Sequence, residues 1–224
     1  MTRAVRRRHE AHVRASNVFN DYSDAFKVTA GWQKSRTALA ACVTEARRLF
    51  ARQEQSIQDR RAAAEQIRAG RQSLRKGIAV IVKVGKLVTV DETTMATLQI
   101  PRSVSDVELL ACARGLLNRV TPYADSFVAE GLPPGVLQSV QDRIDRFVAA
   151  KDEYAAAREN FTAASESIRR TQARADLLVD ALEAIVADTS EALPEVLPIL
   201  RMAKRVGPRT QPVAEAPPIA LRAA

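Results

Sequence analysis

The stretch "FVAAKDEYAAARENFTAASESI", residues 147–168, has the clearest periodicity in the chain. Its apolar positions recur every three or four residues and alternate between large side chains, such as Tyr154 and Phe161, and small ones, such as Ala157. This spacing places one apolar seam along one side of a helix, and the small residues allow a partner helix to approach closely. The seam continues to Ile185, so we expect a long helix of the coiled-coil type.

A second long helix is predicted in the N-terminal half. Apolar residues follow the same spacing from Trp32 onward, which indicates a helix of about 55 residues. Gly70, Gly77 and Gly85 interrupt it, and because each costs about 1 kcal/mol relative to alanine, they are candidate bends. The run Ile78–Val90 is rich in β-branched residues. It would suit a buried strand as well as a helix.

Shorter helices are expected on either side of these two. Residues 2–26 carry an apolar stripe, and a turn is predicted after it. Ser105 and Glu108 have the S-x-x-E spacing of a capping box, which predicts a helix start. Pro122 lacks the N–H that an interior helical position donates, so this helix should kink or restart at Thr121. A final short helix is predicted within residues 193–206, with a proline near its start.

Two similar pentapeptides suggest an internal repeat. "YSDAF" at Tyr22–Phe26 recurs 101 positions later as "YADSF" at Tyr123–Phe127, and nine identities share this offset. Two alanine-rich amphipathic hairpins could match this well by coincidence, so duplication and coincidence both stay open. Duplication would make Ile78–Val90 helical, since the corresponding segment has a helical pattern. In both copies, the tyrosine and phenylalanine are expected in the core and the aspartate in solvent.

The predicted fold is all-α. It is a four-helix bundle of two short-helix/long-helix hairpins, with a short C-terminal helix in addition. The first hairpin covers residues 1–90, a connection covers 91–104, and the second hairpin with the final helix covers 105–206. Residues 207–224 lack any period and are expected to be a disordered tail.

Composition limits the class of protein. Cys42 and Cys112 show neither CxxC spacing nor a disulfide framework, and the N-terminus lacks the apolar region of a secretory signal, so we expect a cytoplasmic protein. The longest apolar run, Ile78–Val90, is shorter than the ~20 residues that cross a bilayer. No transmembrane span is therefore predicted.

Motifs for catalysis and cofactor binding are missing from the sequence. It holds no glycine-rich phosphate loop, HExxH, G-x-S-x-G or acidic calcium loop, so we expect no enzyme activity and no cofactor. His9 and His12 would share one helical face, but the arginines beside them would repel a metal ion, and no metal site is expected. The formal net charge is +8. Basic residues near the N-terminus form the one candidate site, for an anion or nucleic acid: Arg3, Arg6, Arg7, Arg8 and Arg14.

The long seams favour a structural or protein-interaction module without catalytic machinery, whose partners are other helices or a second copy. The two long helices also differ in charge. Residues 45–76 have nine basic residues against four acidic, whereas residues 135–188 have seven against ten, and opposite signs help to fix the register of packed helices. One alternative is a nucleic-acid-binding protein that uses the basic N-terminal arm and the arginine-rich second helix. Another is a peripheral membrane-active helical protein.

Overall fold

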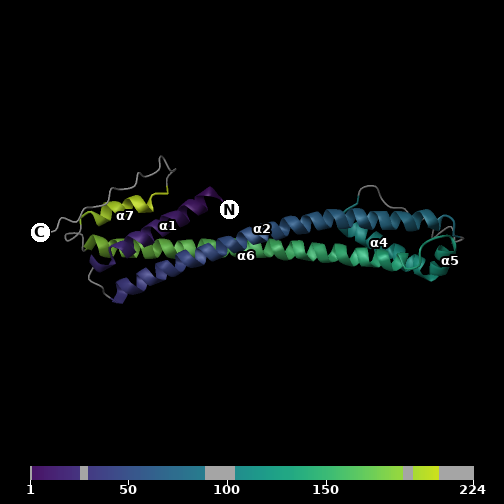
Figure 1. The fold of residues 1–224 in the computed structure, drawn as a ribbon, viewed down its shortest axis with the longest axis horizontal. Coiled ribbons are helices and arrows are strands. Elements are labelled where there is room, and N and C mark those ends of the chain that lie inside the picture. Colours follow the sequence, from purple (N-terminus) through teal and green to yellow (C-terminus); the bar gives the residue numbers. More distant parts are fainter. Residues whose placement is uncertain (1, 26–29, 89–103, 189–193, 207–224) are drawn as a thin grey trace, which may run out of the picture. The chain divides into compact units, whose positions relative to one another are not determined.

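The computed structural model describes residues 2–25, 30–88, 104–188 and 194–206, and these residues form helices and turns without any strand (Figure 1). The predicted all-α class is therefore confirmed for this part of the chain. The predicted connection lies outside it except for Val104, as does the predicted tail. The elements are α1 (Arg3–Asp21), the 3-10 turn η1 (Ser23–Ala25), α2 (Ala30–Gly85), α4 (Asp106–Val120), the 3-10 turn η2 (Thr121–Tyr123), α5 (Ala124–Ala129), α6 (Val136–Asp188) and α7 (Val196–Lys204).

The two long helices match their predictions. The α2 helix has 56 residues and α6 has 53. They pack antiparallel, and the run that could have been a strand belongs to α2 up to Gly85. Thr89 and Val90, which end that run, lie outside the described residues.

The chain divides into two compact units, and each takes a part of both long helices. Unit 1 comprises Met1–Ala51 and Ala164–Ala224, and unit 2 comprises Arg52–Ala163. Unit 1 therefore contains α1, α7, the first part of α2 and the last part of α6. Unit 2 contains the rest of α2 and α6, together with α4 and α5.

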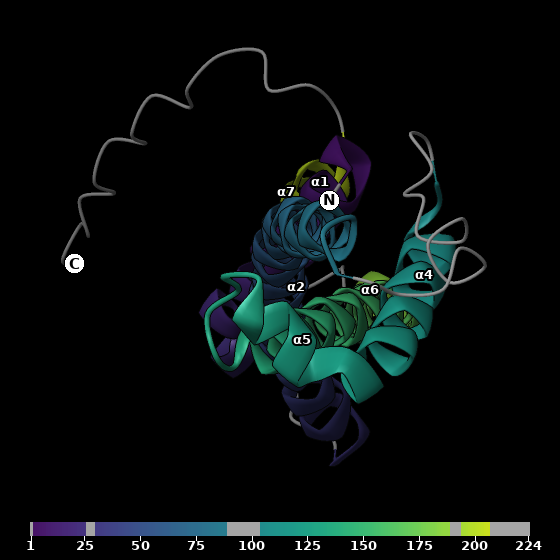
Figure 2. The same ribbon diagram turned by 90° about the vertical axis from the view of Figure 1, so that its right-hand side faces the viewer.

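The core of unit 2 collects side chains from all four of its α-helices. Leu74 and Ile81 from α2, Leu109 from α4 and Phe127 from α5 join one buried cluster, and Phe147 from α6 is fully buried in it. Figure 2 shows α4 and α5 beside α6. Burial of this apolar surface is what holds the short helices on the long ones.

Local signals set the ends of α4 as predicted. Ser105 Oγ accepts from the Glu108 N–H at 3.2 Å, and the Glu108 carboxylate accepts from the Ser105 N–H at 2.7 Å, which completes a capping box. The α4 helix stops at Val120, one residue before the predicted break, and η2 with Pro122 leads into α5. Both predictions are confirmed.

The core of unit 1 is built around two rings. Phe19 of α1 and Trp32 of α2 meet edge to face, with their centroids 5.7 Å apart, and both are fully buried. Val179 of α6 and Leu200 of α7 belong to the same cluster. The α7 helix runs along α1 (Figure 1).

Two expected helix boundaries differ from the structure. The first helix ends at Asp21, and the last begins at Val196, so that the proline predicted inside its start, Pro194, comes before its N-cap Glu195. Phe26, which was predicted to belong to the first helix, lies outside the described residues.

The glycines of α2 mark close contacts instead of interrupting the helix. A Cβ at Gly70 would come within 3.1 Å of the Phe147 ring, and one at Gly77 within 3.0 Å of Val140 Cγ2. The helix passes both positions unbroken and ends at Gly85. The glycines therefore let α6 approach α2 within unit 2, and the prediction that they could mark bends stays a prediction.

Gly115 of α4, by contrast, makes no close contact that would require a glycine. A Cβ there would meet no atom within 4 Å, so Gly115→Ala should raise the free energy of unfolding by about 0.5–1 kcal/mol through helix propensity. Urea denaturation followed by circular dichroism measures this. Gly77→Ala is the matched control, since its added methyl group crowds Val140. A Gly77→Ala variant that gained as much stability as Gly115→Ala would contradict the close-contact interpretation.

The residues of the two pentapeptides lie in comparable places. Tyr22 comes just before the 3-10 turn η1, and Tyr123 is the last residue of η2. Both are half-buried, each against the core of its own unit, and Phe127 is buried. Asp24 and Asp125 are not buried, and duplication remains a prediction that these observations support. At the same offset, both members of these pairs are buried: Leu39 and Val140, Val43 and Ile144, Ile78 and Val179, and Ile81 and Leu182.

Candidate functional site

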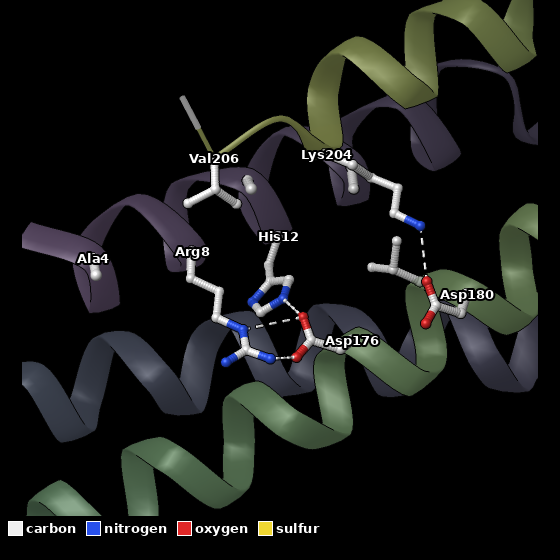
Figure 3. A pocket seen from close by; sticks show the side chains of 10 residues that line it. Ala4, Arg8, His12, Asp176, Asp180, Lys204 and Val206 are labelled. Carbon is white, nitrogen blue, oxygen red and sulfur yellow. Dashed lines mark hydrogen bonds and ion pairs between the residues drawn. The ribbon is translucent and has the colours of Figure 1, made fainter. Parts of the chain in front are cut away.

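Three helices of unit 1, α1, α6 and α7, line a cavity of ≈ 240 Å³ that is partly open to solvent (Figure 3). Half of the residues that line it are alanine or valine. Three of these are alanines of α1, which are seven and four residues apart and therefore share one face of that helix. Val179 of α6 and Val206, just after α7, complete this apolar part. Its members are Ala4, Ala11, Ala15, Val179 and Val206.

A buried histidine and an arginine of α1 share one carboxylate of α6. His12, whose side chain is only 7% exposed, lies with Nε2 at 2.7 Å from Asp176 Oδ1. Arg8 donates to the same oxygen from Nε at 3.3 Å and from Nη2 to Asp176 Oδ2. Because an ionised carboxylate can only accept, the His12 ring donates to Asp176 Oδ1 from Nε2.

The opposite rim of the cavity joins α7 to α6. Lys204 donates from Nζ to Asp180 Oδ1 at 2.8 Å and also to Glu183. Burial lowers the pKa of Lys204, but the hydrogen bonds to the two carboxylates outweigh burial and leave the pKa above its usual value. Arg14 of α1 donates to the carbonyl oxygens of Ala203 and Arg205, at 3.2 Å and 3.0 Å. An α1 side chain thus satisfies two carbonyls at the C-terminal end of α7, that of Ala203 and that of the C-cap residue Arg205.

His9 lies one turn before His12 but in a different environment. Its ring contacts the edge of Phe50, with centroids 5.0 Å apart, and Nδ1 has no hydrogen-bond partner among the described residues. Burial lowers the pKa of His9, and the positive charges of Arg47 and His12 lower it further. The folded unit 1 therefore favours the neutral imidazole.

This environment predicts a pH dependence of stability. The pKa of His9 is lower in the folded than in the unfolded chain, so its contribution is complete above the ordinary pKa of 6.5. As the pH falls below 6.5 the unfolded chain binds the proton first, and stability is lost until the folded pKa is passed. We expect wild type to lose more unfolding free energy between pH 7.5 and 5.5 than His9→Phe. Urea denaturation of both proteins at both pH values measures this. Equal losses would contradict a lowered pKa.

The structure separates the five arginines of the predicted anion site. Arg8 is paired with Asp176, and Arg14 is bound to the end of α7. Arg3 and Arg6 are exposed on α1, and Arg7 is half-buried. Two of the five thus have contacts within unit 1, and binding of nucleic acid through this cluster stays a prediction.

Sequence reasoning missed the acidic side of this site. Asp176, Asp180 and Glu183 recur at helical spacing near the end of α6, so they lie along one face of that helix. The helical spacing of these three acidic residues was the signal that the sequence offered, because a basic first helix packs favourably against an acidic surface. The two histidines could be identified from the sequence, but their different surroundings could not.

The described residues contain no group of three or more histidine, cysteine, aspartate or glutamate side chains that could hold a metal ion. In the same part of the chain, every helix is too short or too polar to cross a bilayer. Comparison with protein-family models, curated proteins and solved structures gave no match to this chain.

Proposed function

We propose that this protein is a non-enzymatic helical module that binds other proteins through the paired part of its long helices in unit 2. We also propose that the chain consists of two short-helix/long-helix hairpins, which are related by duplication and packed as a four-helix bundle. The coincidence of buried positions at the offset of 101 residues supports it. The proposed partners are other helices.

We define the paired stretch as residues 52–67 of α2 and 148–163 of α6. The observation that carries the proposal is that this stretch buries no large apolar side chain. Its larger apolar side chains are only half-buried, and two of them, Ile67 and Val148, pack against the core of unit 2; the others are Ile57, Tyr154 and Phe161. The side chains that it buries fully are small or polar: Gln53, Ser56, Ala63, Ala150 and Ala157.

Half-exposed rings at helical spacing suit a partner helix. Tyr154 and Phe161 are seven residues apart, so they lie on the same face of α6 two turns from each other. The Arg60 guanidinium lies 5.5 Å from the Phe161 ring centroid, and a cation above an aromatic face is favourable. Aromatic residues and arginine are the types most enriched at protein interfaces. The side chains on this face would become fully buried against an amphipathic helix.

Site-specific cross-linking tests the proposal. A photoreactive phenylalanine at position 154 or 161 should form a cross-link to a defined protein in the native cell, whereas the same residue at exposed Ala156 should not. The purified partner should then bind the wild-type protein at least ten times more tightly than the Tyr154→Asp/Phe161→Asp variant. Circular dichroism must show that this variant stays folded.

Equal cross-linking at position 156, or unchanged affinity of a folded double variant, would contradict the proposal. A cross-link to a second copy would identify the partner as the protein itself, and sedimentation would then show a dimer that the double variant weakens.

A further inference from the structure

We infer that the cavity between α1, α6 and α7 is a binding site for a small, neutral, mostly apolar molecule that carries one hydroxyl group, such as a phenol. This site lies in unit 1 and is independent of the proposed protein-binding stretch. The module would then have a second binding function, for a small molecule.

The size and lining of the cavity favour an apolar ring. A closed cavity of ~150 Å³ lined by apolar side chains is large enough for benzene, so this partly open cavity of ≈ 240 Å³ has room for a ring with one or two substituents. Small-molecule sites are typically apolar with a few placed polar groups. Half of the lining here is alanine and valine, which fits that description.

The charges at the cavity are already paired, which favours a neutral ligand. The positive charge of Arg8 is matched by Asp176, and that of Lys204 by Asp180. A charged ligand would have to compete with one of these ion pairs and lose its own hydration. An uncharged molecule has neither cost.

Two groups at the cavity keep unused hydrogen-bonding capacity. His12 binds Asp176 through Nε2, and Nδ1 has no partner among the described residues. Arg8 binds Asp176 through Nε and Nη2, and its third nitrogen points away from that carboxylate (Figure 3). The free His12 nitrogen accepts in a neutral ring and donates in a protonated one, and the free Arg8 nitrogen can donate. A hydroxyl group is the smallest uncharged group that can satisfy either, because it both donates and accepts.

Titration with p-cresol tests the inference. In 1H–15N spectra of the full chain, p-cresol at millimolar concentration should shift amide signals of residues that line the cavity in α1, α6 and α7. Toluene, which lacks the hydroxyl, and benzoate, which is charged, should each bind at least threefold more weakly. Stronger binding of benzoate than of p-cresol would overturn the inference of a neutral ligand.

Two valine variants separate a real site from general affinity for aromatic molecules. Val206→Trp places a ring at the edge of the cavity and should weaken p-cresol binding at least tenfold. Val107→Trp is the matched control, because Val107 is an exposed valine of α4 in unit 2, and it should leave binding unchanged. Neither residue is in the core, so both variants should fold. Absence of p-cresol binding to wild type, or equal binding by the two variants, would overturn the inference.

Discussion

Replacement of Trp32 by alanine should lower the free energy of unfolding by about 3–5 kcal/mol. Trp32 is one of the largest fully buried side chains in the protein, and it meets Phe19 edge to face at 5.7 Å. Alanine removes this apolar surface and leaves a cavity in the core of unit 1, which the long helices cannot close without bending. The expected effect is large relative to the ~5–15 kcal/mol that stabilises a typical domain.

Circular dichroism in a urea series is the suitable measurement for Trp32→Ala, because the chain has one tryptophan and the variant loses it as a fluorescent probe. Leu177→Ala serves as the control in the same unit, since Leu177 is 71% exposed. It should change stability by less than about 0.5 kcal/mol. Similar losses in the two variants would show that Trp32 does not support the core of unit 1.

Phe147→Ala should be equally damaging in unit 2, with a loss of about 3–5 kcal/mol. The Phe147 ring is fully buried in a cluster to which α2, α4, α5 and α6 all contribute. It also lies against the backbone of α2 at Gly70, where no side chain could replace the lost contacts. The same urea titration measures this effect.

Phe161→Ala is the matched control for Phe147→Ala. Both are phenylalanines in the seam of α6, but Phe161 is half-buried and belongs to neither core cluster. Its loss should cost less than half as much. If the two variants were equally destabilised, burial in the cluster would not be what distinguishes them. Two separate transitions in either variant would show that the units unfold independently.

The helices were largely predictable because their signals are local. The seam of α6, the capping box at Ser105 and the break before Pro122 each depend on residues within a few turns of one another. A three-and-four spacing of apolar residues can be buried only by a helix, whatever it packs against. The boundaries were less well predicted, as at Asp21 and Val196, since the ends of helices depend on contacts with other elements.

The candidate site was predictable only in part. The sequence identified Arg8 and Arg14 as members of a basic cluster and His12 as part of an apolar face. It did not indicate that Asp176, 164 positions after His12, would accept from its ring, nor that Arg14 would bind the end of α7. A periodic pattern specifies which face of a helix is buried but not which distant helix covers it.

The sequence by itself determined the all-α class, the two long helices and the start of α4 at its capping box. Only the tertiary structure showed that each compact unit combines parts of both long helices, that Gly70 and Gly77 allow close packing, and that α1, α6 and α7 leave a cavity. The physical reason is the range of the interactions. Backbone hydrogen bonds and apolar periodicity act over a few residues. Close packing and ion pairing depend instead on which distant side chains the antiparallel helices bring together.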